Sequence, residues 1–149
     1  MSYKIDFNAA DVNWQIDMLK LFPKIANQYF YPAMHRATSE IKGAIEPNIP
    51  VRTGLAKSEF RKAVSGKGLN ITGRVGWKYG TKAWYINVHE YGAPPHAIGY
   101  VPSLNVTIKK HPGVPALKFM ERGQEQADDK VNPEMARAAE AVVNHLARK

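Results

Sequence analysis

The sequence has no cysteine among its 149 residues. Disulfide bonds, thiolate metal sites and cysteine nucleophiles are therefore excluded. The absence fits folding in a reducing cytoplasm. The sequence also lacks any apolar run near the roughly 18 residues that a membrane helix needs. Residues 1–7 lack the charged-then-apolar pattern of a signal peptide, so we expect a soluble protein that is not exported by the usual route.

Acidic residues are scarce in the middle of the chain. Residues 52–118 hold eleven lysines and arginines but only two acids, Glu59 and Glu90. Residues 1–51 hold five charges of each sign, and residues 119–149 hold five basic and six acidic residues, so the net charge of +8 comes from the central third. A field of one sign favours an acidic partner, either nucleic acid or a protein surface, although it can equally keep a surface soluble.

Signatures of catalysis are missing as well. No serine stands in a Gly-x-Ser-x-Gly elbow, and no glycine-rich turn is long enough to cradle phosphates. His89, His96 and His111 could surround a metal with Glu90, but no pair has the four-residue spacing of a zinc protease. Glu59 and Glu90 could serve a small hydrolase, yet ion pairing explains them more simply. We therefore expect a protein that is not an enzyme and needs no cofactor or metal.

Helical periodicity is present at both ends of the chain. Apolar residues recur every four positions from Ile25 to Ile45, which predicts a long helix that begins after Pro23. Pro32 should kink this helix or split it in two. A second helical region opens at Pro115 and continues towards the C-terminus, with a break at Asn132-Pro133.

Strand patterns occupy the middle of the chain. Leu55 to Ser65 fits a short helix running into a strand, and Gly66-Lys67-Gly68 is the expected hairpin tip. Leu69 to Trp77 alternates cleanly and predicts a strand with one solvated side. Leu104 to Lys109 alternates again, whereas residues 83–90 fit either a short helix or a strand.

These elements predict an α+β fold. We expect one domain over residues 1–149, with an antiparallel sheet of about four strands packed against the long N-terminal helix and the C-terminal helices. Residues 1–20 are expected to contain an extended arm, and Tyr3 to Phe7 alternates like a short strand. Residues 92–103, which contain three prolines, are expected to be a loop.

Aromatic and basic residues are interleaved after the central strand. The aromatic residues are Trp77, Tyr79, Trp84, Tyr85 and Tyr91. Such a mixture can stack on bases while the cations hold phosphates. We favour the simpler interpretation that most of these rings pack against the helices or fill a contact between subunits.

Several short motifs occur in a recognisable order. They are Pro50-x-x-Thr53-Gly54, then Trp84-Tyr85-Ile86-Asn87-Val88-His89-Glu90-Tyr91-Gly92, then His111-Pro112-Gly113, then Leu117-Lys118-Phe119-Met120. From about Leu19 to the C-terminus the chain resembles the tail-component family of tailed phages that is typified by the gene-ten product of HK-type siphophages. Members of that family have similar Pro-Val-x-Thr-Gly, Tyr-Ala-x-x-Val-Glu-Phe-Gly-Thr and His-Pro-Gly motifs. Ala93 departs from the family pattern, which has threonine there.

The resemblance implies a structural virion protein that forms a ring at the head–tail junction as a neck, tail-completion or tail-terminator subunit. Its partners would be other copies of the chain, in six-fold or twelve-fold rings, together with the connector or stopper and the tail-tube proteins. Phage DNA would pass nearby without specific binding, and no membrane would be involved. The implied location is the virion, with assembly in the host cytoplasm.

The resemblance also assigns candidate residues. Its structural turns are Pro50, Thr53, Gly54, Tyr85, Glu90, Gly92, His111, Pro112, Gly113 and Phe119. Candidate subunit contacts are Trp84, Tyr85 and Tyr91. Candidate contacts to the DNA channel or to an acidic neighbour are Arg52, Lys57, Arg61, Lys62, Arg74, Lys78, Lys82, Lys109 and Lys110. We expect Glu90 to make a structural ion pair or to cap a backbone turn.

Two alternatives stay open at this point. The charge of the central third also fits an independent small basic nucleic-acid-binding module. A small hydrolase that uses Glu59, Glu90 or His89 is the other alternative.

Overall fold

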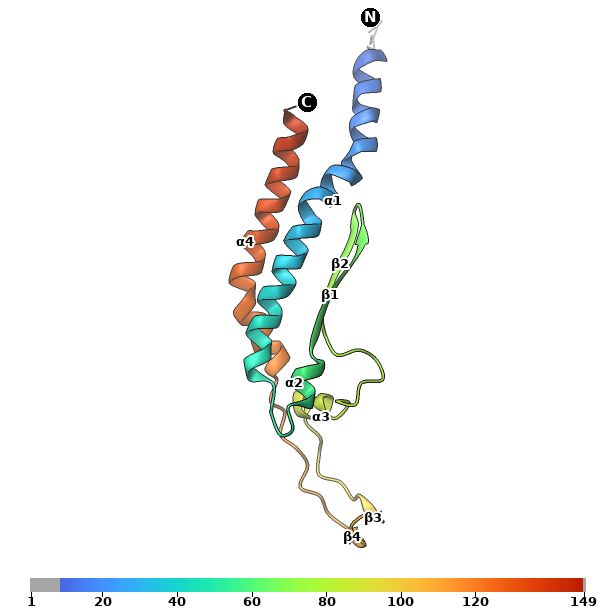
Figure 1. Cartoon of the computed structure of the whole chain (residues 1–149), viewed down its shortest axis with the longest axis vertical. Helices are drawn as coiled ribbons and strands as arrows, with labels where there is room; N and C mark the ends of the chain where they lie inside the picture. The colour runs from blue at the N-terminus through green and yellow to red at the C-terminus, as the bar shows by residue number, and fades with distance from the viewer. Residues whose placement is uncertain (1–8, 149) are drawn as a thin grey trace, which may run out of the picture. The chain divides into compact units, whose positions relative to one another are not determined.

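The computed structural model describes residues 9–148, with side chains from Asp17 onward. In chain order the elements are α1 (Ala9–Ile45), the 3₁₀ turn η1 (Glu46–Asn48), α2 (Leu55–Glu59), β1 (Arg61–Lys67), β2 (Asn70–Gly76), α3 (Ile86–Tyr91), β3 (Gly99–Val101), β4 (Val106–Ile108) and α4 (Phe119–Ala147) (Figure 1). The chain therefore mixes helices and strands, with a long helix near each end. The strand expected at Tyr3 to Phe7 lies outside the described residues.

The described strands form two separate antiparallel pairs, β1 with β2 and β3 with β4. The prediction of one sheet with about four strands is therefore wrong. The segment between β2 and β3 explains the difference. Residues 83–90, which fitted either state, mostly enter the helix α3. Pro94 and Pro95 follow it, and neither has an N–H to donate to a strand ladder.

Both long helices pass through prolines without ending. Helix α1 begins at Ala9, well before the expected start, and contains Pro23 and Pro32, while α4 contains Pro133. Of the kink or split expected at Pro32, the split does not occur, and the expected break at Asn132-Pro133 is wrong. Both of these prolines are exposed, so a carbonyl that loses its helical partner there can bond to water. No helix in the described part of the chain is long and apolar enough to cross a membrane.

The chain divides into two compact units. The first holds the described parts of residues 1–39, 63–74 and 130–149, and the second holds residues 40–62 and 75–129. The long helices and the β1–β2 pair contribute residues to both units.

The first unit is built on an antiparallel helix contact. Tyr29 of α1 makes a hydrogen bond with His145 of α4, and Arg36 makes an ion pair with Glu134. The later residue of α1 thus pairs with the earlier residue of α4, as antiparallel helices require. Small residues such as Ala33 on α1 and Ala138 on α4 are buried and permit a close approach. At the turn between β1 and β2, the amide of Gly68 donates a hydrogen bond of 3.0 Å to the side-chain oxygen of Asn27.

Strand β2 alternates as expected. Ile71, Gly73 and Val75 are half-buried, whereas the residues between them are exposed. Leu69 does not share the apolar face, because it lies in the turn and is 60% exposed.

The second unit has an aromatic core. Its buried residues are Ile45, Ile49, Ala56, Phe60, Ala83, Ile86 and Phe119. The ring of Trp77 lies between two of them, with centroid distances of 4.7 Å to Phe60 and 6.2 Å to Phe119. Its indole N–H donates a hydrogen bond of 2.7 Å to the carbonyl of Ala56, which satisfies the one polar atom of a largely apolar ring.

A hairpin extends from the second unit. Bridges join Ala93 to Val114 and His96 to His111, and the β3–β4 ladder continues in the same register to the pair Val101–Val106. We call residues 93–114 the arm. Figure 1 shows β3 and β4 at its far end, away from α2 and α3. A two-stranded ladder carries the chain through a region that was expected to be a loop.

Candidate functional site

The start of α4 is capped by a side chain from another helix. The carboxylate of Glu90 on α3 accepts hydrogen bonds from the amides of Met120, at 2.9 Å, and Glu121, at 3.4 Å. Lys118, directly before α4, has a φ of 49°, and its own side chain makes an ion pair with Glu121. The carboxylate therefore satisfies amides that a helix leaves free and lies at the positive end of its dipole. Glu90 was expected to make a structural ion pair or to cap a backbone turn, and in the structure it accepts hydrogen bonds from amides at the start of a helix.

The charge of Glu90 is well placed for this role. The side chain belongs to a residue that is only 7% exposed, so its two amide partners replace lost water.

The two glycine motifs meet beside this cap. Gly92 has a φ of 74° and Gly113 a φ of 84°, which favour glycine. A Cβ atom on Gly92 would lie 2.8 Å from the carbonyl oxygen of Val114, and one on Gly113 would overlap the carbonyl oxygen of Ala93. The two segments pair antiparallel at the base of the arm, where Ala93 and Val114 exchange hydrogen bonds of 2.8 and 2.9 Å.

The histidine of the His-Pro-Gly motif supports the same turn. The Nδ1 atom of His111 accepts a hydrogen bond of 3.1 Å from the amide of Gly113. Across the arm, the ring of His96 lies 5.1 Å from that of His111, measured between centroids. Pro112, between the two motif residues, is exposed.

The Pro-x-x-Thr-Gly motif starts the short helix α2. The hydroxyl oxygen of Thr53 accepts a hydrogen bond of 3.4 Å from the amide of Leu55, and Gly54 accepts one of 2.9 Å from Ser58. The helix then places Ala56 and Phe60 in the core of the second unit.

All ten predicted turn residues belong to the second unit. Glu90, Gly92, His111, Gly113 and Phe119 lie together at the start of α4 and the base of the arm. Pro50, Thr53 and Gly54 lie at the entrance to α2, whose residues line the same core. These residues form a frame of backbone turns around one aromatic core.

The aromatic residues of the motif region divide into two kinds. Tyr85 is half-buried and packs against the core. Trp84 is 69% exposed and Tyr91 is 80% exposed. Exposed aromatic side chains of this size are candidates for contact with another protein.

A second group of exposed apolar residues was not predicted from the sequence. They lie on the arm and are Ile98, Tyr100, Leu104 and Val106. Only Leu104 and Val106 fell inside a predicted strand. The alternation of Ile98 with Tyr100 was a usable signal, but the neighbouring prolines made the segment resemble a loop.

All nine candidate basic residues are exposed, which suits contact with an acidic partner. They lie on different elements: Lys57 on α2, Lys62 on β1, Arg74 on β2 and Lys109 beyond β4 are examples. Arg74 belongs to the first unit and the other eight belong to the second.

Two ion pairs shift ionisation near the core. The hydrogen bond from Lys42, at 2.7 Å, lowers the pKa of Glu46. The hydrogen bond to Glu121 raises the pKa of Lys118, and the charges of Glu121 and Glu125 add to that effect. Both are solvent-facing pairs of the kind that stabilise a helix end weakly.

The residues considered for catalysis have structural partners. Glu59 accepts a hydrogen bond from the hydroxyl of Thr81, and Glu90 caps α4. The ring of His89 packs edge-on against Tyr85. Within residues 17–148, no group of three or more histidine and acidic side chains is placed to hold a metal.

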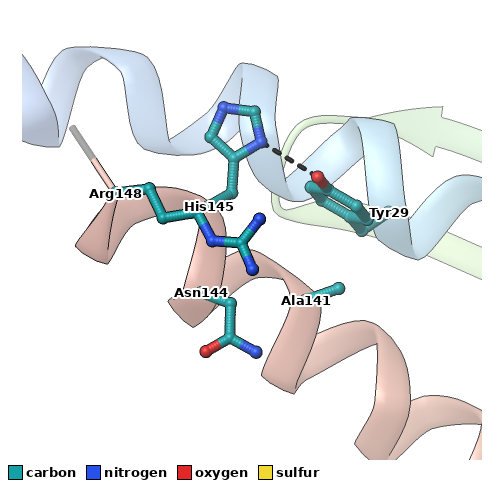
Figure 2. Close-up of a pocket in the computed structure, with 5 residues that line it drawn as sticks. All are labelled: Tyr29, Ala141, Asn144, His145 and Arg148. Carbon is teal, nitrogen blue, oxygen red and sulfur yellow. Dashed lines mark hydrogen bonds between the residues drawn. The ribbon is translucent and has the colours of Figure 1, made fainter.

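A pocket of about 500 Å³ lies in the first unit, between α1 and α4. Figure 2 shows the hydroxyl of Tyr29 directed at His145, with an O–N distance of 2.9 Å, and Asn144 and Arg148 on the same wall. Beside it, Arg36 and Arg137 both pair with Glu134, which neutralises part of their charge. The pocket holds a tyrosine–histidine contact but has no serine or cysteine that the imidazole could activate.

The second unit thus combines backbone turns around an aromatic core with exposed apolar side chains, and exposed basic residues are spread over several elements. Comparison of the chain with protein-family models, with curated proteins and with solved structures finds no match.

Proposed function

We propose that this chain is a structural virion protein that forms a ring at the head–tail junction of a long-tailed phage. It acts as a neck, tail-completion or tail-terminator subunit and joins the connector to the tail tube around the DNA channel. It catalyses no reaction and needs no cofactor or membrane. Its partners are further copies of the chain and the neighbouring rings.

The observation that carries the proposal is how the motif residues are used. The residues of the resemblance are turns, caps and core positions, and the frame that they build leaves Trp84 and Tyr91 in water. A monomer gains nothing from exposing such rings, whereas a ring subunit buries them against its neighbour. The exposed basic residues then suit a channel for DNA or an acidic neighbouring ring.

The direct test is removal of the gene from the phage genome. We expect separate heads and tails to accumulate, and purified protein added to such a lysate should restore joined, infectious particles. Imaging of the restored junction then gives the ring order, six-fold or twelve-fold. Complete head–tail joints in particles that lack the polypeptide would overturn the proposal.

An independent nucleic-acid-binding module is the second candidate, and the exposure of all nine basic residues favours it. A gel shift across a series of salt concentrations separates the two candidates. A dedicated binder is tight at physiological salt and loses affinity steeply as salt rises. The isolated ring subunit should bind weakly.

A further inference from the structure

The end of the arm is an apolar hairpin that is mostly in water. The exposed fractions are 46% for Ile98, 60% for Tyr100, 66% for Leu104 and 45% for Val106. In the β3–β4 ladder, Val101 faces Val106 and Tyr100 faces Thr107, so each face of the hairpin carries a large apolar group. A two-stranded hairpin is marginally stable in water by itself and gains stability when a further surface covers it.

The arm also carries charge of one sign. Residues 93–114 contain no aspartate or glutamate, whereas Lys109 and Lys110 follow β4 directly and are both exposed. The surface that covers the arm should therefore combine apolar area with negative charge.

The same unit presents such a surface elsewhere. Glu121, Glu125 and Asp128 are exposed on α4 at helical spacing, and we call them the acidic face. They point away from the stripe of α4 that includes the buried residues Phe119 and Ala127.

Apolar groups lie at the start of the acidic face. Leu117, just before α4, is 37% exposed, and its amide donates a hydrogen bond of 2.8 Å to the carbonyl of His89 on α3. Tyr91, two residues after His89, is 80% exposed. Apolar groups next to negative charge are what an apolar, basic arm requires.

We propose that the arm of one copy of the chain docks on the acidic face of α4, beside Tyr91 and Leu117, of a second copy. The inference rests on the proposed ring and names the contact that forms it. The arm and the acidic face are different patches of one chain, so the contact is head-to-tail. A head-to-tail contact repeats from copy to copy and closes into a ring when the rotation allows it.

A second copy fits this arm better than DNA does. DNA offers phosphates to Lys109 and Lys110, but its backbone gives no cover to Tyr100 or Leu104. The arm also extends away from α2 and α3 of its own unit, which leaves its end open to a neighbour (Figure 1).

A charge exchange tests the contact. One variant, Lys109→Glu with Lys110→Glu, reverses the charge of the arm. The other, Glu125→Lys with Asp128→Lys, reverses the acidic face. Each variant alone should associate with itself about tenfold or more weakly than the natural protein at low salt, because like charges then meet at every contact.

An equal mixture of the two variants should recover association. In alternating copies, each reversed arm meets a reversed face and each natural arm meets a natural face, so every contact is again between opposite charges. Rings of six or twelve accommodate this alternation. Sedimentation velocity and light scattering measure the assemblies, and circular dichroism checks that each variant is folded.

The matched control is Lys24→Glu with Lys67→Glu, which makes the same change of charge at exposed residues outside the arm and outside the candidate contact residues. This control should associate like the natural protein and should not restore the variant with the reversed face. Leu104→Ser adds a variant without a charge change, and it should also weaken association.

Three results would overturn the inference: natural protein that stays monomeric at every concentration, a reversed-arm variant that associates normally, or a mixture that recovers nothing. The last would mean that the arm docks on another surface or another protein. If the reversed-arm variant associates normally while the gene remains essential for joining heads to tails, the arm contact fails and the proposed function stands. If joining proceeds without the gene, the function fails and the charge exchange still decides the contact.

Discussion

At the scale of the residue, Glu90 shows how one side chain can connect two helices. The first amides of α4 have no partner within the helix. Lys118 directly before it has a backbone φ of 49°, and its ammonium group carries no acceptor that could cap those amides. A carboxylate from α3 caps them instead, which makes the start of α4 depend on the position of α3.

Glu90→Ala should therefore destabilise the protein by about 2 kcal/mol, because it leaves two part-buried amides without their protein partner at a helix N-terminus. Glu90→Gln keeps one acceptor without the charge and should cost about half as much. Urea unfolding of the purified variants measures both. Equal stability of Glu90→Ala and the natural protein would mean that water caps α4 equally well.

The antiparallel bridge at the base of the arm gives a second prediction for a single residue. Gly113→Ala should destabilise by about 2 kcal/mol or more, because the new Cβ would overlap the carbonyl of Ala93 at a positive φ. Gly43→Ala is the matched control on the exposed side of α1, where an added Cβ meets nothing within 4 Å. It should stabilise by about 0.5–1 kcal/mol through helix propensity. Thermal unfolding compares the two variants. A similar effect of both substitutions would contradict the close approach of Gly113 to the carbonyl of Ala93.

At the scale of the element, local patterns predicted helices and strands better than they predicted their ends. The period of four from Ile25 onward identified α1, and the alternation from Leu69 identified β2. The prolines misled the prediction, because Pro32 and Pro133 face solvent and the packed sides of the helices continue past them. Propensity alone does not report which side of a helix is packed.

The sheet could not be predicted because pairing is a long-range property. Residues 83–90 have a pattern that suits either state, and the burial of Ile86 and Glu90 four positions apart fits the helix. The candidate site fared unevenly for the same reason. Turn residues such as Gly92 and Gly113 are recognisable from local sequence, whereas the partner of Glu90 lies about 30 positions away.

Pro32 allows a test of how α1 tolerates its interruption. Pro32→Ala restores an N–H that can bond to the carbonyl of Gln28 and removes the clash of the ring with that carbonyl. Because Pro32 is exposed, no packing is lost, and we expect a gain of about 1–3 kcal/mol in the free energy of unfolding. Urea unfolding measures it. A loss of stability would show that the packing of α1 needs the geometry that the proline imposes.

At the scale of the whole molecule, the two exposed groups of apolar residues have different supports. Trp84 lies just before α3 and Tyr91 is its last residue, next to the core and the Gly92 turn. Tyr100 and Leu104, in contrast, lie on a hairpin that is supported only by its own strands. An aromatic surface at Trp84 and Tyr91 and an extended arm on one chain suit an assembly in which each copy binds the next. Association should then depend on both groups, while folding depends on neither.

Trp84→Ala combined with Tyr91→Ala tests the aromatic surface that these two residues form. Both side chains are mostly in water, so the free energy of unfolding should change by no more than about 0.5 kcal/mol. Self-association and head–tail joining should nevertheless fall by about tenfold or more, because aromatic anchors dominate the energy of most protein contacts. The matched control is Tyr79→Ala, which removes a fully exposed ring outside the motifs and should leave association unchanged. Light scattering and the complementation of gene-deleted lysates give the two readouts, and a double variant that joins heads to tails as well as the natural protein would show that these rings are not subunit contacts.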